Sequence, residues 1–212
     1  MFRDALVIGI SALWAFTARA ETVSVGVGMV RNQVITSREV QIYSFLEAAL
    51  YERAPKSKIK PLALDSKAFS KAVQDTLLET AVAREAQSFN LMQVSPEELR
   101  TAEKTVLKAM KGVPAWMKLE VSPEELQKLI GRKIQAKKFI QFRADSSILP
   151  VTDSEAQRYF QENRLKFGDL PFENFKENIK SYLGKAQLEK RLKDWFDVLL
   201  SKYQVKNLIA EI

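Results

Sequence analysis

The spacing of apolar residues predicts a mostly helical chain with a short strand segment near each end. Valines alternate with small residues over 23–28, and a second apolar piece follows at 33–35, which is typical of a strand or a small hairpin. From residue 40 onward, apolar positions recur mainly at intervals of three, four and seven, as on one face of a helix. The segment 203–209 again resembles a strand. Because a lone strand leaves backbone groups unpaired, we expect a mainly α fold with one small sheet built from the N- and C-terminal strands.

Helix starts are marked by a hydroxyl residue placed three positions before a glutamate. In this pattern the hydroxyl accepts a hydrogen bond from the third backbone amide and the glutamate reaches back to the cap. The chain repeats it four times, at residues 36–39, 95–98, 122–125 and 152–155. Asp65 is the expected cap of a further helix that ends near Asn90.

Proline and glycine clusters separate the predicted helices. The segment 54–64 has two prolines and three lysines in place of periodic apolar residues, which predicts an exposed loop. Gly112-Val113-Pro114 ends one helix, and Gly168 to Pro171 interrupts the chain before a long closing helix.

The first twenty residues are typical of a signal peptide. An apolar run over 5–16 follows a short charged start, and Ala18-Arg19-Ala20 ends it with small residues at the positions that a signal peptidase reads. The run is shorter than the roughly 20 residues that a spanning helix needs. We expect cleavage after Ala20, a periplasmic location and no stable membrane insertion of the mature residues 21–212, with an uncleaved N-terminal anchor as the alternative.

The order of these segments resembles the core module of SurA-like periplasmic chaperones and of related exported parvulin-type isomerases. In that family a strand of the type found at 27–40 leads into the first helix, and a long helix like 77–91 precedes a Val-Ser-Pro-Glu-Glu start like 94–98. The segment 151–167 looks like the family's entry into its isomerase domain, and 172–208 looks like its closing helix and strand. The resemblance covers essentially the whole mature chain, and its specific signal is the order of the motifs.

The chain departs from the isomerase-bearing members of that family where their extra domain would stand. Only Gly168 to Pro171 separates Phe167 from the closing helix, and no domain of ordinary size fits there. The chain also has no His and no Cys, residues that parvulin active sites commonly use. We therefore expect a chaperone module without an inserted isomerase domain.

Composition narrows the chemistry further. Without His or Cys there is no Ser-His-Asp triad, no Cys-His nucleophile and no imidazole or thiolate metal site. Adjacent glutamates at 97–98 and 124–125 stand at helix starts, where carboxylates serve as caps. The seven glycines are scattered and form no phosphate loop. We expect no enzyme activity and no cofactor; a hydrolase that uses only carboxylates is the alternative, and no convincing pair of acids supports it.

The net charge of +7 favours association with acidic surfaces. The basic residues are spread along helices, as in the stripe Arg100, Lys104, Lys108 and Lys111, without an RNA-binding aromatic motif or a helix-turn-helix pattern. Together with the predicted export, this argues against nucleic acid as a partner. The stripe is either a solvated helix face or a binding surface.

Two segments are candidates for contact with unfolded client polypeptides. The first lies between two helix breaks, where methionine and tryptophan side chains adapt to irregular apolar partners, and the second is the aromatic end of the helix that starts at Ser122. The candidate residues are Met110, Val113, Trp116, Met117, Phe139 and Phe142. Ordinary core packing is the alternative for each of them.

The predicted function is that of an ATP-independent chaperone which holds unfolded outer-membrane or secreted polypeptides in an apolar groove. The alternative is a dedicated assembly protein that binds one specific partner with the same fold. Neither reading fixes the oligomeric state.

Overall fold

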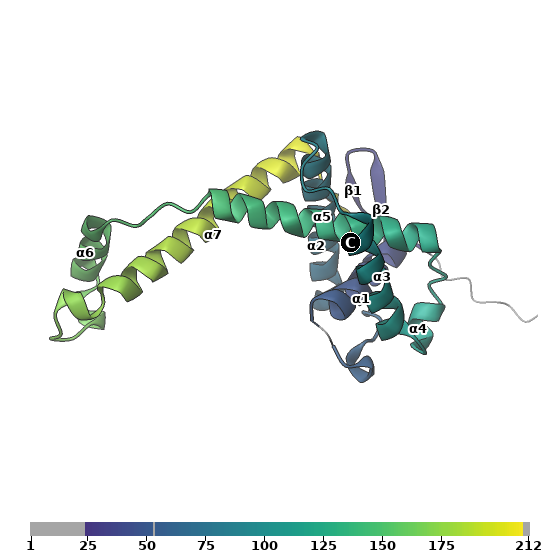
Figure 1. The fold of residues 1–212 in the computed structure, drawn as a ribbon, viewed down its shortest axis with the longest axis horizontal. Helices are drawn as coiled ribbons and strands as arrows, with labels where there is room; N and C mark the ends of the chain where they lie inside the picture. The colour runs from purple at the N-terminus through teal and green to yellow at the C-terminus, as the bar shows by residue number, and fades with distance from the viewer. Residues whose placement is uncertain (1–23, 53, 210–212) are drawn as a thin grey trace, which may run out of the picture.

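The computed structural model describes residues 24–52 and 54–209. The predicted cleavage site after Ala20 lies outside these residues. Within them the fold is mainly helical with one small sheet, as predicted (Figure 1). The elements are β1 (Gly26–Val30), β2 (Gln33–Thr36), α1 (Ser37–Leu50), η1 (Lys56–Lys58), α2 (Lys67–Ser88), α3 (Pro96–Met110), α4 (Pro114–Met117), α5 (Pro123–Ser146), α6 (Asp153–Glu162), η2 (Arg164–Lys166), η3 (Phe172–Asn174), α7 (Lys176–Lys202) and β3 (Lys206–Asn207), where η marks a 3-10 helix.

The sheet joins the two ends of the described chain, as the strand patterns predict. β1 lies in the middle and pairs antiparallel with β2 on one side and with β3 on the other. β3 is only two residues long, shorter than the predicted segment, but further backbone bonds extend the contact: the Arg31 amide donates to the Tyr203 carbonyl at 2.8 Å and the Leu208 amide to the Val27 carbonyl at 3.0 Å. The closing strand therefore fastens the end of α7 to the start of the chain.

Gly28 allows the sheet to pack tightly against α2. A Cβ added at this position would lie 2.8 Å from a methyl carbon of Leu77 and 2.9 Å from the backbone oxygen of Lys206. Both distances are shorter than any normal contact, so only glycine lets β1 approach α2 and β3 together.

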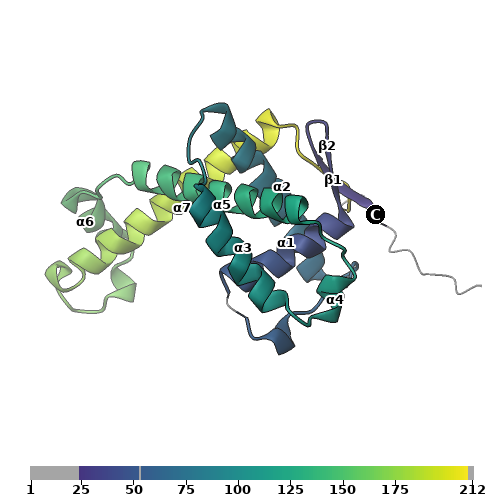
Figure 2. The same ribbon diagram turned by 45° about the vertical axis from the view of Figure 1, so that its right-hand side comes forward.

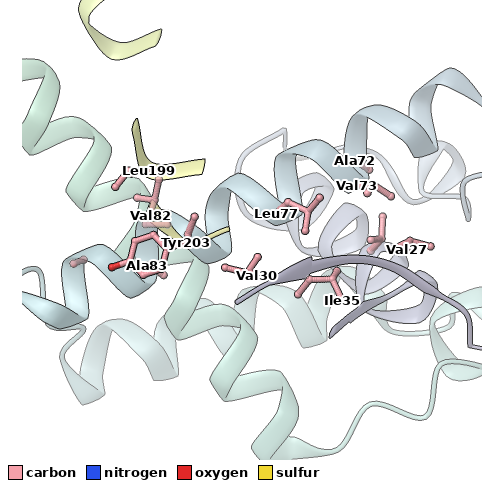
Figure 3. Packing of buried hydrophobic residues seen from close by; sticks show 14 of the residues in the cluster. Val27, Val30, Ile35, Ala72, Val73, Leu77, Val82, Ala83, Leu199 and Tyr203 are labelled. Carbon is pink, nitrogen blue, oxygen red and sulfur yellow. The ribbon is translucent and has the colours of Figure 1, made fainter. Parts of the chain in front are cut away.

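Two hydrophobic clusters fill the body of the molecule. The first lies between the sheet, α2, the middle of α5 and the end of α7 (Figure 3). The second lies between α1, α3 and the N-terminal half of α5, and it includes Ile59 from the loop that follows α1. Because α1 and α5 contribute side chains to both clusters, these two helices join the halves of the body.

The predicted helix caps are present, with two differences. Ser95, Ser122 and Thr152 each accept a hydrogen bond from the amide three residues on, and Thr152 forms the complete reciprocal box with its glutamate. The cap of α2 is Ser66, not Asp65, because the Ser66 hydroxyl accepts from the Phe69 amide. The second difference concerns the glutamates of α3 and α5, which bind cations on other helices.

An extended arm projects from the body (Figures 1 and 2). It consists of the C-terminal end of α5, the linker 147–152, α6, and the N-terminal half of α7, and it carries a small lobe at its far end. α7 has 27 residues, which corresponds to a length of about 40 Å at 1.5 Å per residue. One half of α7 packs on α6 in the lobe and the other half on α2 in the body.

Candidate functional site

Three of the six candidate contact residues, Met110, Val113 and Phe139, are buried, which favours the alternative of core packing for them. Met110 is 2% exposed and Phe139 is 3% exposed, so both lie inside the hydrophobic clusters and have almost no surface to offer a client. Met110 faces inward because α3 turns its apolar face toward α1 and α5. Phe139 packs against the edge of Trp195, with 5.7 Å between ring centroids, where α5 meets α7.

The segment around α4 places its candidates in different environments. Trp116 is half-buried and meets Phe45 edge to face, with ring centroids 5.9 Å apart and planes at 86°, so part of its role is packing. Met117 is 68% exposed. Val113 is buried but lines an apolar groove beside α1. Of these three, Met117 offers the most free apolar surface.

Phe142 lies at the root of the arm and is 43% exposed. Its ring stacks on Phe139, with centroids 6.2 Å apart and planes 13° apart. The aromatic end of α5 is therefore buried on one side and open on the other. The sequence pattern was compatible with either a buried end or a contact surface. In the structure Phe139 is buried and Phe142 is exposed, on neighbouring turns of α5.

The arm exposes more large apolar side chains than its candidate Phe142 alone. Six such side chains between residues 142 and 182 are at least 43% exposed: Phe142, Ile148, Leu149, Leu165, Leu170 and Tyr182. Single exposed apolar residues are normal on a folded protein, so it is their shared position on one projecting element that makes them candidates for contact with a partner. Two of them, Ile148 and Leu149, form an apolar pair directly before Pro150 that is visible in the sequence.

The distal lobe of the arm packs around a small buried centre. In the distal lobe only Ala156, Phe160 and Ile179 are buried, surrounded by partly buried aromatic rings. Asp153 pairs with Lys176 at 2.5 Å and with Lys180 at 2.9 Å, but Asp153 is exposed, and exposed ion pairs contribute about 0–1 kcal/mol. The lobe is thus a small unit with few fully buried side chains, and aromatic ring contacts around Phe160 supply much of its packing.

Buried ion pairs orient the helix from which the arm extends. Arg132 of α5 binds the carboxylates of Glu39 on α1 and Glu79 on α2, the latter at 2.9 Å. The neighbouring Lys133 binds Glu79 at 2.9 Å and Glu47 at 2.8 Å. Burial would lower the pKa of Arg132, but the two carboxylates outweigh it and raise that pKa. Breaking such a network strands a buried charge, so it fixes the direction of α5 relative to α1 and α2.

Tyrosines complete this network. The ammonium of Lys133 lies 3.6 Å from the ring centroid of Tyr43, and Lys137 lies 3.5 Å from that of Tyr51. Burial raises the pKa of Tyr51 to about 12, with Glu47 adding to the shift. Burial likewise raises the pKa of Tyr43. Both phenols stay neutral at physiological pH, so these rings act as faces for the cations.

One glutamate of each pair at a helix start is held by a cation from another helix. Glu98 binds Lys138 at 2.7 Å. Glu125 binds Arg38 at 2.6 Å, and this pairing lowers the pKa of Glu125 below its ordinary value. Glu98 and Glu125 are thereby each paired with a cation from another helix. Among the described residues, no group of three His, Cys, Asp or Glu could hold a metal ion.

Comparisons with protein-family models, curated proteins and solved structures give no match to this chain. The resemblance to SurA-like chaperones therefore rests on the order of the sequence motifs. None of the helices that the structure describes has the length and apolar character needed to cross a membrane.

No pattern in the sequence indicates the apolar groove that Val113 lines. Its other wall is the segment 59–64, which the sequence marks only as a loop. The side chain that holds this loop in place is Gln41, a polar residue on a helix whose periodicity marks only the apolar face. A contact between a helix and a loop about 20 residues apart is set by the tertiary fold, and periodic patterns do not report it.

Proposed function

We propose that this protein is an ATP-independent chaperone that holds unfolded polypeptides by contacts along its arm. The observation that carries the proposal is the set of six exposed apolar side chains on the projecting segment 142–182. An unfolded client offers apolar side chains at irregular spacing. An extended element with separated apolar contacts suits such a client better than one closed pocket does.

The construction of the molecule supports this reading. The arm is anchored at its root by Phe139, Trp195 and the ion pairs of Arg132, so its near end is rigid. Its far end depends on a three-residue core and can adapt to different segments. A rigid base with an adaptable end accommodates clients of varied sequence.

The proposed location is the periplasm, and the proposed mode of action needs no ATP. It rests on the signal pattern of residues 1–20 and on the resemblance to exported chaperones. N-terminal sequencing of the mature protein checks this part. We expect the mature protein to start at Glu21, and a start at Met1 in a cytoplasmic fraction would contradict it.

The central test is suppression of aggregation. An outer-membrane β-barrel protein is unfolded in urea and diluted into buffer without ATP, and light scattering is followed with increasing amounts of the chaperone. We expect scattering to fall in a stoichiometric manner. The triple variant Ile148→Ser, Leu149→Ser, Leu165→Ser should lose most of this effect while its melting temperature changes little, because exposed substitutions cost within about 0.5 kcal/mol each.

The matched control places the same changes on the body. Val25, Phe89 and Leu107 are also large exposed apolar residues, 48–59% exposed against 57–101% for the three arm residues, and their replacement by Ser should leave suppression intact. Equal loss in both triple variants would refute a role for the arm. Crosslinking in periplasm that yields one stoichiometric partner, in place of many clients, would refute a general chaperone and support the dedicated assembly protein.

The proposal excludes catalysis of prolyl isomerisation. Only residues 167–171 lie between η2 and η3, which leaves no room for an isomerase domain. In a proline-limited refolding assay we expect no rate increase at substoichiometric protein. Acceleration under that condition would contradict the proposal.

A further inference from the structure

A second surface of the body combines an apolar groove with a basic rim. The groove lies between the first turn of α1, the loop 59–64 and the segment 113–119, and it has a volume of about 550 Å³. Its apolar lining comes from Ile59, Pro61, Leu64, Val113, Ala115 and Leu119. This volume is within the usual range of about 300–1,000 Å³ for binding pockets, enough for one or two large side chains.

The groove is built before any ligand arrives. The Gln41 amide clamps the backbone of Leu62 from both sides: its nitrogen donates to the Leu62 carbonyl at 2.6 Å, and its oxygen accepts from the Leu62 amide at 2.9 Å. Ile59 is buried in the second cluster and fixes the start of the same loop. A wall held in this way lowers the entropic cost of binding.

The charge around the groove is positive. Lys60 and Lys118 line it. Arg38 also lines the groove, but its charge is balanced by Glu125. Among the described residues that form the lining, none is acidic. The rim therefore presents lysine charges that no carboxylate of the lining neutralises.

We propose that this groove docks an acidic segment of polypeptide, with a large apolar side chain in the groove and flanking carboxylates at Lys60 and Lys118. Charge complementarity selects the flanks and the concave apolar lining selects the central residue. A nucleic acid fits less well, because single strands bind by stacking on aromatic side chains and the lining contains none. A flat lipid surface would leave the recessed lining unfilled.

This inference goes beyond holding clients by the arm. Figure 1 shows α4, beside the groove, at the end of the molecule opposite to α6. A client that carried both an apolar stretch and an acidic apolar motif could bind at both places. The second contact would then form at a raised effective concentration, which increases overall affinity without new contacts at either site.

The test is fluorescence anisotropy with short fluorescein-labelled peptides and the full mature chain. One peptide has a Leu-Phe pair flanked on both sides by Asp and Glu. In a second the acids are replaced by Lys, and in a third the Leu-Phe pair is replaced by Ser. We expect the first to bind at least about tenfold more tightly than either of the others, and its affinity to fall as NaCl is raised.

Two groove variants test whether the peptide binds in the groove. Lys60→Glu with Lys118→Glu should weaken binding at least about tenfold, because it turns attraction into repulsion. The control Lys185→Glu with Lys190→Glu makes the same change in net charge on α7 and should alter the affinity less than about twofold. Ala115→Phe fills the groove without a change in charge and should also weaken binding, provided that its melting temperature shows an intact fold.

Three results would overturn the proposal. Equal loss in the control double variant would mean that binding reports net charge alone. Retained binding in a folded Ala115→Phe variant would mean that the groove is not used. Failure of the first peptide, together with groove-dependent binding to phosphatidylglycerol vesicles, would assign the surface to a membrane. Arm variants that lose aggregation suppression should still bind the peptide, so failure of one proposal leaves the other standing.

Discussion

Tyr203→Phe removes a single hydroxyl from the joint that attaches the end of α7 to α2. The Tyr203 hydroxyl donates to the Glu85 carboxylate at 2.7 Å, and the Lys202 ammonium donates to the same oxygen at 2.7 Å. Both Tyr203 and Glu85 are buried. Phenylalanine keeps the ring, so the substitution leaves the packing in place and removes only the hydrogen bond.

The expected cost follows from the charge on the acceptor. A hydrogen bond to a charged group contributes about 1.5–3 kcal/mol, and its loss leaves the buried carboxylate with one partner fewer. We therefore expect Tyr203→Phe to lower the free energy of unfolding by about 2 kcal/mol at pH 7. For a chain of this length that corresponds to a fall of about 4–8 °C in melting temperature.

The pH dependence provides an independent check. Burial raises the pKa of Glu85, but the hydrogen bonds from Lys202 and Tyr203 outweigh it and hold that pKa below its ordinary value of 4.5. A lowered pKa in the folded state means stabilisation that is present above pH 4.5 and is lost as the pH falls through the folded value. The difference between wild type and variant should therefore be largest near pH 7 and shrink below about pH 4.5.

Urea denaturation followed by circular dichroism at several pH values measures both effects. Tyr182→Phe is the matched control, because Tyr182 is on the same helix but exposed, and its variant should differ from wild type by less than about 0.5 kcal/mol. A cost below about 0.5 kcal/mol for Tyr203→Phe, or a cost that stays constant into acid, would refute the assigned role of the hydroxyl.

Five further substitutions test other parts of the fold by thermal melting and hydrogen exchange. Gly28→Ala should cost about 1–3 kcal/mol because its Cβ meets Leu77, whereas Gly131→Ala, with open space around it in α5, should stabilise by up to about 1 kcal/mol; equal effects would contradict the close approach. Phe160→Ala should cost about 3–5 kcal/mol and so remove amide protection from the distal lobe while α2 keeps its own; intact protection in the lobe would contradict its three-residue core. Met117→Ser should change stability by less than about 0.5 kcal/mol and Trp116→Ser by more than about 1 kcal/mol, and the reverse order would contradict their burial.

The sequence predicted those features whose causes are local. Ser95, Ser122 and Thr152 cap helices because the hydroxyl and the amide that it binds are three residues apart. Even here neighbouring candidates compete: Asp65 and Ser66 both suit a cap, and Ser66 takes the position. The pairing of the two terminal strands was also predicted, because the chain offered only two convincing strand segments.

Features that depend on distant partners could not be predicted in this way. Glu125 stands where a capping carboxylate is expected, yet Arg38 binds it across 87 residues of sequence. Met110 and Met117 look equally suited to client contact, and only the direction of α3 relative to α1 buries the first. The arm could not be predicted for a similar reason. The apolar periodicity of α7 predicts one buried face, but it does not show that one half of the helix packs in the lobe and the other half in the body.

The pairing of Gly28 with Asn207 also governs how the chain reaches its folded state. A contact between residues so far apart in sequence carries a large loop-closure entropy, and such contacts form late and slow the folding rate. α7 and β3 are synthesised last. During synthesis α1 and α2 can therefore pack together early, but β1 gains its second neighbouring strand only after the final segment has emerged. Until then one edge of β1 stays open to pairing with other strands, a period in which the protein is itself prone to aggregation.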